Sequence, residues 1–401
     1  MNSPLHQRRL VLTRGAALTG AAAAGILLPS VLRAQTAKVR VGLMLPFTGT
    51  FAQLGTSNAN GIRLAIQEQG GKLGGREVEF ITLDDEADPS KAVENANKLV
   101  LKERVDVLIG TVHSGVQMGV QKVARESGVL NIIPNAGLHA ATRALCAPNI
   151  FRASFSNAQA SLPLGRVLMS RGLKNAVWIT WKYAAGDESF EGFEEGYKAA
   201  GGTIVKAIGL PFPSVEFQAQ LSEIASLKPD VVVAYFAGGG AVKFIKDYAA
   251  AGLKGRIPLY GPGFLTESVL AAAGPDAEGI VTTLHYSDSL QTPRNQQFRL
   301  AYAKAFRSQP DVYAVHGYDA GQLLIHGANA VQGDFTKKAE LYKAMQSAVI
   351  ESPRGRFTLS KAHNPVQDIY LRQVVGGEDK VIGVAAKAVA DSGAGCRLAS
   401  T

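Results

Sequence analysis

Residues 39–45 read Val-Arg-Val-Gly-Leu-Met-Leu, an apolar run that predicts a buried β-strand ending at Pro46. Apolar residues then recur at helical spacing, which predicts a helix over 56–69. The pair Gly70-Gly71 follows and is typical of a helix stop. A second apolar strand is expected over 78–83, so the pattern opens as strand, helix, strand.

The same alternation continues beyond this unit. Asp88-Pro89-Ser90 predicts the start of a helix over 90–103, because proline suits the first helical turn. A third strand is expected over 105–109 and ends at Gly110. Strands that alternate with helices in this rhythm are typical of a parallel sheet covered on both faces.

The alternation of strands and helices begins again in the second half of the chain. Strands are expected over 176–180, 203–210 and 231–236, and helices over 189–200 and 215–227. Gly201-Gly202 falls where Gly70-Gly71 falls in the first half. We therefore expect an α/β protein with two similar lobes, each a doubly wound sheet. Ligands of such sheets lie beyond the carboxyl ends of the strands, so two facing lobes would enclose one cleft.

The first 34 residues have the composition of a cleaved export signal rather than of a folded domain. Arg8 and Arg9 form a basic start, small and apolar residues fill 16–28, and Ala34 offers a cleavage position before Gln35. The segment fits an ordinary Sec signal and also resembles a twin-arginine signal, and both routes lead to the periplasm. No later stretch is apolar enough to be embedded in a membrane.

Composition excludes several classes of function. The 401 residues are 46% hydrophobic, enough for a sizeable core. The net charge of +9 includes four arginines of the signal, so the exported chain carries 9 − 4 = +5. Its basic residues are scattered, and no nucleic-acid partner is expected. In an oxidising compartment Cys146 and Cys396 either form a disulfide or remain two buried thiols.

Polar residues follow the predicted strands of the first lobe. The segment from Gly110 to Gly115 precedes a helix, so Ser114 either binds a ligand carboxylate there or only caps that helix. His113 adjoins Ser114 at the same strand end and is a further candidate. Backbone amides of 135–137 complete the expected carboxylate grip.

Aromatic and small residues follow the predicted strands of the second lobe, in segments 181–186, 236–240 and 260–264. The sequence carries no dinucleotide fingerprint, phosphate loop or nucleophile elbow. Its histidines are dispersed without the spacing of metal ligands. We therefore expect no cofactor, no metal and no enzyme activity, and a periplasmic hydrolase is disfavoured.

From Val39 to about Val375 the chain resembles the periplasmic solute-binding proteins of branched-chain amino-acid (HAAT) type ABC importers. The resemblance rests on 39–49, Ala52-Gln53-Leu54-Gly55, 70–76, Asp84-Asp85 with Asp88-Pro89, and Ala250-Ala251-Gly252-Leu253. It implies a type I periplasmic binding protein: two Rossmann-like lobes, joined by three hinge crossings near 152–156, 282–286 and 364–370. The first lobe would comprise 38–153 and 286–365, and the second 156–284 and 368–401.

The resemblance also implies how such a protein works. Its two lobes would close around a small molecule and present it to the permease subunits of an ABC transporter, and a monomer fits this action. A ligand sensor on the same fold is an alternative, as is a protein that binds branched-chain amino acids or short amides.

The family's amino-acid site maps onto this sequence only in part. Its carboxylate grip falls on Ser114 and on Asn135, Ala136 and Gly137. Its acidic partner for the α-ammonium falls on Gly263, and its frequent tyrosine near Gly238, so the ammonium partner is missing. Burying an ammonium without a partner costs several kcal/mol.

An aromatic acid, such as benzoate, a hydroxybenzoate or a phenylpropenoate, is therefore the expected ligand. Trp181, Tyr183 and Phe236 would hold its ring, and Gln53 of the first-lobe motif is a further candidate. The ammonium contact would otherwise have to come from Asp187, Glu188 or Glu267.

Overall fold

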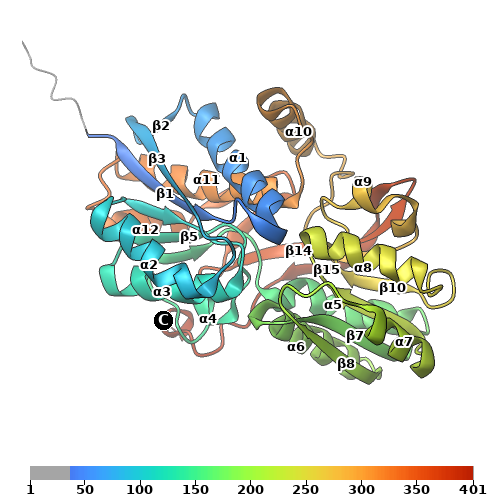
Figure 1. Ribbon diagram of the computed structural model, residues 1–401. Coiled ribbons are helices and arrows are strands. Elements are labelled where there is room, and N and C mark those ends of the chain that lie inside the picture. The colour runs from blue at the N-terminus through green and yellow to red at the C-terminus, as the bar shows by residue number, and fades with distance from the viewer. Residues whose placement is uncertain (1–36, 401) are drawn as a thin grey trace, which may run out of the picture. The chain divides into compact units, whose positions relative to one another are not determined.

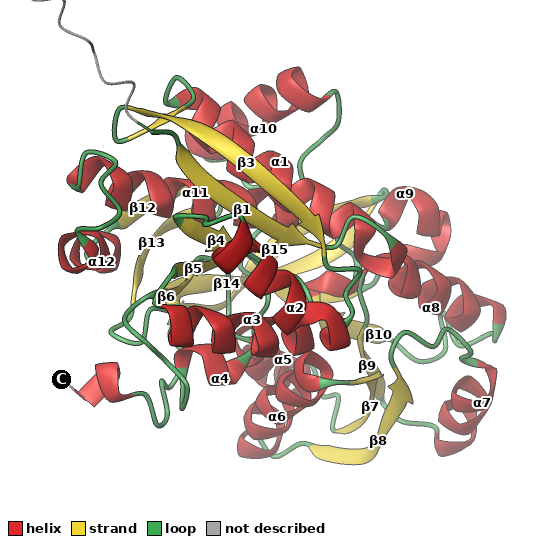
Figure 2. Ribbon diagram, turned by 60° about the vertical axis from the view of Figure 1, so that its left-hand side comes forward, coloured by secondary structure: helices red, strands yellow, loops and turns green. Residues whose placement is uncertain are grey.

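The computed structural model describes residues 37–400 of the 401-residue chain (Figure 1). The predicted signal peptide, residues 1–34, lies outside the described residues. The described part is one compact unit built on two β-sheets with helices packed around them (Figure 2).

The first sheet has the strand order β2-β3-β1-β4-β5-β6. Its strands are β1 (Val39–Leu45), β2 (Lys72–Leu73), β3 (Arg76–Asp84), β4 (Val107–Ile109), β5 (Leu130–Ile133) and β6 (Ile150–Arg152). All neighbours pair in parallel except β2, which forms an antiparallel hairpin with β3.

Helices cover both faces of this sheet, as the sequence predicts. They are α1 (Ala52–Glu68), α2 (Ala92–Asn97), α3 (Ser114–Ser127), α4 (His139–Thr142), α10 (Pro293–Phe306), α11 (Val312–Ala330) and α12 (Lys338–Gln346). Val41 and Leu43 of β1 belong to the cluster that includes α1 and α11, whereas Met44 packs with α2 and α3. Alternate residues of one buried strand thus serve two helix layers.

The second sheet has the order β12-β13-β14-β11-β10-β9-β7-β8, with β15 paired to β14. Its strands are β7 (Asn175–Lys182), β8 (Thr203–Pro211), β9 (Val231–Tyr235), β10 (Leu259–Pro262), β11 (Val281–Leu284), β12 (Val349–Ser352), β13 (Gly355–Leu359), β14 (Pro365–Val375) and β15 (Glu378–Val389). Its helices are α5 (Asn157–Ser170), α6 (Ala184–Ala199), α7 (Gln218–Leu227), α8 (Gly238–Ala250) and α9 (Leu270–Ala273).

The two halves repeat one topology. The order β3-β1-β4-β5-β6 in the first sheet matches β8-β7-β9-β10-β11 in the second, and all these neighbours are parallel. The direction of winding reverses between β1 and β4 and between β7 and β9, so these are the topological switch points. We call the first sheet with its helices the first lobe, and strands β7–β11 with α5–α9 the second. The prediction of two doubly wound lobes is confirmed.

The glycine pairs end helices in both lobes. The helix predicted over 56–69 is α1, and Gly70 and Gly71 follow it with φ angles of 72° and 73°. Gly201 follows α6 with φ 92°. Side chains rarely adopt this left-handed backbone, so glycine is favoured at both stops.

The chain passes between the two lobes three times. It leaves β6 of the first lobe and enters α5, which packs on α6. It leaves β11 of the second lobe and enters α10, which packs on α1. The third passage lies just before β14, where the backbone N–H of Arg152 in β6 donates to the carbonyl of His363 at 3.0 Å, and β14 then continues to Leu371, which pairs with β11. Short connections between two lobes, such as these three, can act as hinges when the lobes open and close.

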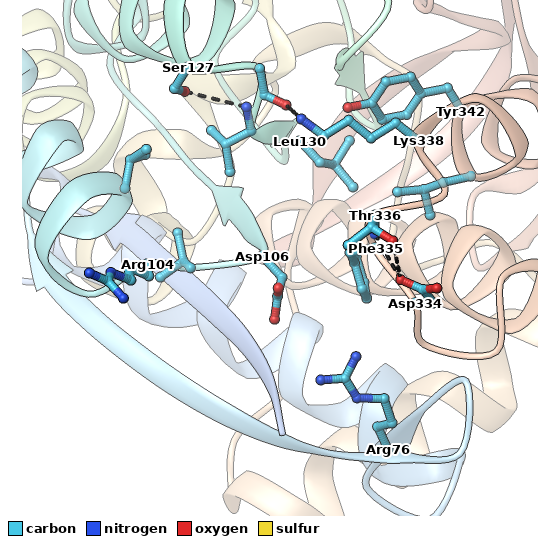
Figure 3. A pocket seen from close by; sticks show the side chains of 15 residues that line it. Arg76, Arg104, Asp106, Ser127, Leu130, Asp334, Phe335, Thr336, Lys338 and Tyr342 are labelled. Atoms are coloured by element: carbon cyan, nitrogen blue, oxygen red, sulfur yellow. Dashed lines mark hydrogen bonds between the residues drawn. The ribbon is translucent and has the colours of Figure 1, made fainter. Parts of the chain in front are cut away.

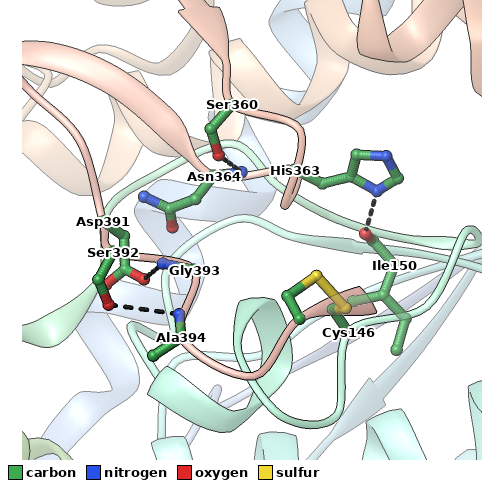
Figure 4. Close-up of a disulfide and its surroundings, with 10 residues drawn as sticks. Cys146, Ile150, Ser360, His363, Asn364, Asp391, Ser392, Gly393 and Ala394 are labelled. Carbon is green, nitrogen blue, oxygen red and sulfur yellow. Dashed lines mark hydrogen bonds between the residues drawn. A yellow bond between two sulfur atoms is a disulfide. The ribbon is translucent and has the colours of Figure 1, made fainter. Parts of the chain in front are cut away.

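The C-terminal segment lies beside the first lobe (Figure 4). Cys146, between α4 and β6, is bonded to Cys396, with Cα atoms 5.5 Å apart. Arg143 also pairs with Asp391 across 2.9 Å. The predicted assignment of 368–401 to the second lobe is therefore wrong for residues 391–396, which the disulfide and the ion pair hold on the first.

Candidate ligand-binding cleft

A cavity lies where the carboxyl ends of the two sheets face each other. Its first-lobe lining comes from loops after β1, β4, β5 and β6 and from the start of α11, and its second-lobe lining from loops after β7, β9 and β10. The lining residues are Phe51, Leu54, Val112, Ser114, Asn135, Gly137, Phe155, Asn157, Tyr183, Ala185, Tyr235, Ala237, Phe264 and Tyr313. Both topological switch points thus contribute to one site.

The lining is aromatic and uncharged. Six of these side chains are phenylalanine or tyrosine, and none of the described lining residues carries a charge. Burial raises the pKa of Tyr235 to about 12 and that of Tyr183 well above its ordinary value, so both phenols stay protonated. The buried hydroxyl of Tyr313 has no hydrogen-bond partner among the described residues. The cavity therefore presents neutral donors among apolar rings.

The cavity is narrow, with a volume of about 20 Å³. That is the room of one water molecule and far below the usual size of a ligand pocket. The lobes therefore lie close together in this structure, and a ring enters only when they part or their side chains move.

Ser114 lies in the cavity but does not cap α3. His113 is the N-cap, because its Nδ1 accepts from the backbone N–H of Gly115 at 3.0 Å. Ser114 is the first helical residue, and its Oγ lies 3.3 Å from Nδ2 of Asn157, which donates to it. The alternative that Ser114 only caps the helix is thus wrong, and its hydroxyl proton is left to point elsewhere.

His113 is a structural residue behind the lining rather than part of it. Its ring stacks on Tyr183 with centroids 4.9 Å apart. Burial lowers its pKa to about 4, so the imidazole is neutral and its Nδ1 accepts from the helix. The prediction that His113 contacts the ligand is therefore wrong in this structure, because the residue lies behind the lining.

The segment 135–137 is only partly available to a ligand. Asn135 and Gly137 line the cavity. The amide of Ala136 instead donates to the carbonyl of Thr111 at 2.9 Å, so it does not grip a carboxylate. A Cβ at Gly137 would lie 2.2 Å from Oδ1 of Asn157, which explains glycine at this close approach.

Of the three ring-holding residues predicted in the second lobe, Tyr183 lines the cavity, whereas Trp181 and Phe236 do not. Trp181 and Phe236 are fully buried in the core behind the cleft. The Trp181 indole donates to the carbonyl of Ser214 at 2.7 Å, and its ring packs edge-on against Phe236. Successive strand residues point to opposite faces, so Tyr235 faces the cavity whereas Phe236 faces the core.

Gly238 and Gly263 do not leave room for a ligand. A Cβ at Gly238 would lie 2.4 Å from the carbonyl oxygen of Thr50. A Cβ at Gly263 would lie 2.5 Å from both Arg372 Nη2 and Leu284 Cβ. The space beside both glycines is thus occupied by protein. Gln53 also lies outside the cavity and donates to Ser57 at 3.2 Å.

The acids that could replace the missing ammonium partner are engaged elsewhere. Glu267 pairs with Arg372 and accepts from the backbone N–H of Val312 at 3.2 Å. Glu188 accepts from the backbone N–H of His139 at 2.9 Å and from Asn157 Nδ2 at 2.7 Å. Asp187 is exposed. None of the three lines the cavity within residues 37–400.

Several lining residues escaped sequence analysis. Tyr235 lies next to the predicted residue Phe236, and Phe264 next to the predicted residue Gly263. Knowing which strand residues face the cavity would have identified both. Asn157 begins the helix after the first crossing, which is a detectable position. The sequence around Phe155 and Tyr313 does not indicate a binding site, because packing of distant elements brings these residues to the cavity.

A larger cavity of about 560 Å³ lies elsewhere on the first lobe (Figure 3). Arg76, Arg104, Asp106 and Lys338 contribute to its lining. It adjoins the amino ends of β4 and β5, whereas ligands of doubly wound sheets lie at the carboxyl ends. Lys338 there donates to the carbonyl of Gly128 at 2.7 Å. Position and chemistry therefore favour the smaller cavity as the ligand site.

Two further classes of site are missing from the described residues. No three histidine, cysteine, aspartate or glutamate side chains in 37–400 are grouped to hold a metal ion. No helix in that range has the length and apolarity needed to span a membrane.

The comparisons with known proteins agree with this architecture. Residues 38–379 match the family described as periplasmic binding protein, and the chain belongs to that family. The chain is 31% identical over 350 residues to Leu/Ile/Val-binding protein homolog 6 of Brucella melitensis, covering 85% of this chain and 88% of that protein. The fold is that of a type I periplasmic binding protein, and the family implies a periplasmic location.

Two solved structures are similar over nearly the whole described chain. A solute-binding protein of an ABC transporter from R. palustris, in complex with benzoate, is 54% identical with a TM-score of 0.88, covering 90% of this chain and 100% of that one. Another, from Rhodopseudomonas palustris BisB5 in complex with 3,4-dihydroxybenzoic acid, is 32% identical with a TM-score of 0.84, covering 89% and 99%. These relatives are substrate-binding proteins of ABC transporters rather than enzymes.

Proposed function

We propose that this protein captures a small aromatic carboxylate, of the benzoate, hydroxybenzoate or phenylpropenoate class, and delivers it to the permease of an ABC importer. The observation that carries the proposal is the cavity lining, which joins six aromatic rings to Ser114 and has no charged side chain among its described residues. The benzoate complex of a 54% identical protein supports the same ligand class.

The chemistry of capture follows from the lining. The ligand carboxylate accepts from the Ser114 hydroxyl and from protonated phenols, of which Tyr183 and Tyr235 lie on the second lobe. Hydrogen bonds to a charged group contribute roughly 1.5–3 kcal/mol each. The ring packs among the aromatic side chains, and the hinge strands absorb the backbone change as the lobes close.

Branched-chain amino acids and short amides are the second candidate ligands, since curated relatives are named for leucine, isoleucine and valine. An amino acid would bring an ammonium into a lining that offers it no carboxylate. Glu188 and Glu267 satisfy other groups. A buried ammonium without a partner costs several kcal/mol, so the aromatic acid is favoured.

The proposal includes export and partnership. Residues 1–34 direct the chain to the periplasm, by the Sec or the twin-arginine route, and N-terminal sequencing of the exported protein should begin at Gln35. The monomer then serves a permease; a ligand sensor on the same fold would instead leave uptake unchanged when the protein is deleted.

The deciding experiment is a thermal-shift panel on the exported chain, refolded beforehand to remove bound ligand. Benzoate, 4-hydroxybenzoate and 4-coumarate are compared with leucine, valine and short amides. Ligand at 100 times its dissociation constant stabilises the protein by about 2.7 kcal/mol. Stabilisation by aromatic acids alone supports the proposal, whereas stabilisation by leucine or valine alone overturns it.

A further inference from the structure

Glu188 lies outside the cavity but is joined to it through one side chain. It belongs to α6 of the second lobe, and its Oε2 accepts from Nδ2 of Asn157 at 2.7 Å. The same Nδ2 donates to Oγ of Ser114 at 3.3 Å. Asn157 and Ser114 both line the cavity. A continuous chain of hydrogen bonds therefore runs from a second-lobe carboxylate to the serine of the ligand site.

The carboxylate determines which way the Asn157 amide faces. With both hydrogens of Nδ2 used, Oδ1 faces Gly137, where a Cβ would lie 2.2 Å from it. A flipped amide would place Oδ1 2.7 Å from Glu188 Oε2. Two acceptors at this distance repel each other when the carboxylate is ionised, which is the case above pH 7 because burial raises the pKa of Glu188 to about 7. Glu188 thus holds the amide with its donor toward Ser114.

This orientation in turn determines what Ser114 does. Because its Oγ already accepts from Asn157, its own proton is free to be donated into the cavity. A flipped Asn157 would offer Ser114 an oxygen and would draw that proton away from the ligand.

The same carboxylate also joins the two lobes. Oε2 of Glu188 accepts from the backbone N–H of His139, the first residue of α4 in the first lobe, at 2.9 Å. The loop before α4 carries Gly137 and is held from behind by Arg152, which donates to the carbonyl of Leu138. The contact of α6 with α4 therefore exists only when the lobes are together.

We propose that Glu188 is a positioning residue for ligand binding, which directs the Ser114 hydroxyl toward the ligand carboxylate through Asn157 and does so when α6 meets α4. The inference rests on the proposed function, since it requires a carboxylate ligand at Ser114. It assigns to Glu188 no contact with the ligand itself.

Calorimetric titration with benzoate at pH 8, where Glu188 is ionised, tests the proposal on two variants that both remove the negative charge. In Glu188→Gln an amide oxygen can accept both hydrogen bonds at the place of Oε2, so affinity within about threefold of wild type, or tighter, is expected. Glu188→Leu removes both bonds and should weaken binding at least tenfold, the lower end of what a hydrogen bond to a charged group contributes. Glu195→Leu is the matched control, because that acid is exposed on the same helix and should not change affinity.

A double-mutant cycle separates positioning from a general structural effect. Once Ser114→Ala has removed the hydroxyl, Glu188→Leu should weaken binding by less than about threefold further, because its effect passes through that hydroxyl. Additive losses overturn the proposal, as does an affinity of Glu188→Gln as weak as that of Glu188→Leu. If leucine prevents folding at the α4–α6 contact, Glu188→Ala replaces it in the cycle.

The failure of the proposed function would look different. Wild type would then bind none of the aromatic acids in the panel, and both proposals would fall together. Normal binding of benzoate by wild type with additive losses overturns the role of Glu188 alone.

Discussion

The imidazoles of His285 and His316 face each other with their Nε2 atoms 2.6 Å apart, and both side chains are buried. His316 Nδ1 also lies 3.0 Å from Oδ1 of Asn135. An acceptor at Nδ1 assigns the proton of His316 to that nitrogen, so His285 donates through Nε2. His285 follows β11 at the second crossing and His316 lies on α11, so this neutral pair connects the hinge to a cavity residue.

Acid should destabilise the folded protein through this pair. Burial lowers the pKa of both histidines well below the ordinary value of about 6.5, with Arg354 acting in the same direction. The unfolded chain therefore binds protons below about pH 6.5 that the folded chain excludes. Stability is complete above that pH and falls as the pH decreases, by up to about 1.4 kcal/mol per pH unit for each proton. Thermal unfolding measured from pH 8 to pH 5 checks this slope.

The double variant His285→Leu/His316→Leu isolates the contribution of the pair. It should unfold at a lower temperature at pH 8, because Asn135 loses its partner, but its dependence on pH should be shallower. His326→Leu, at an exposed position of the same helix, should keep the wild-type slope. Equal slopes in the wild type and the double variant would contradict the prediction.

Ser114→Ala should weaken binding of benzoate by about 10- to 150-fold, because it removes a donor to a charged oxygen. The fold should tolerate the change, since His113 rather than Ser114 caps α3. Isothermal titration checks the affinity. Ser127→Ala, at the other end of the same helix, should bind as wild type does, and an unchanged affinity of Ser114→Ala would remove Ser114 from the site.

Much of this fold could be predicted because its information is local. The apolar run 39–45 and the glycine pair after α1 each fix an element boundary without reference to the rest of the chain. The parallel pairing then follows from the alternation of strands and helices. The first-lobe loop at Ser114 was found for the same reason, since ligands lie where strands end.

The second-lobe wall could not be predicted in the same way. The side of a strand on which a residue points changes at each position, so an error of one residue exchanged Tyr235 for Phe236. Space beside a glycine is not encoded locally either, because Leu284 and Arg372 fill the position beside Gly263. Tyr313 reaches the cavity from a helix far along the chain.

Gly263→Asp should destabilise the protein rather than create amino-acid binding. The new Cβ would meet the Leu284 Cβ and the Arg372 guanidinium at 2.5 Å. Overpacking of this kind typically costs 1–3 kcal/mol. Chemical denaturation and leucine titration check both parts of the prediction.

Gly239→Ala is the control for Gly263→Asp, since its nearest neighbour, Thr50 Oγ1, lies at 3.6 Å, an ordinary contact. That variant should keep the wild-type stability or gain a little, because alanine favours the helix α8. Leucine binding by Gly263→Asp in a stable fold would show that the side chain reaches the ligand after all.

The double variant Cys146→Ser/Cys396→Ser should release the C-terminal segment while leaving the ligand site intact. The bond closes a loop of 250 residues, and loss of such a link typically costs about 2–5 kcal/mol. The tail then lacks its covalent link and keeps only noncovalent contacts such as the Arg143–Asp391 ion pair, so limited proteolysis should cut near 390–400 while benzoate affinity stays unchanged. Asp391→Asn breaks only that ion pair, and it should protect the tail better than the double variant. A tail equally resistant in all three proteins would mean that packing, rather than the disulfide, fixes it.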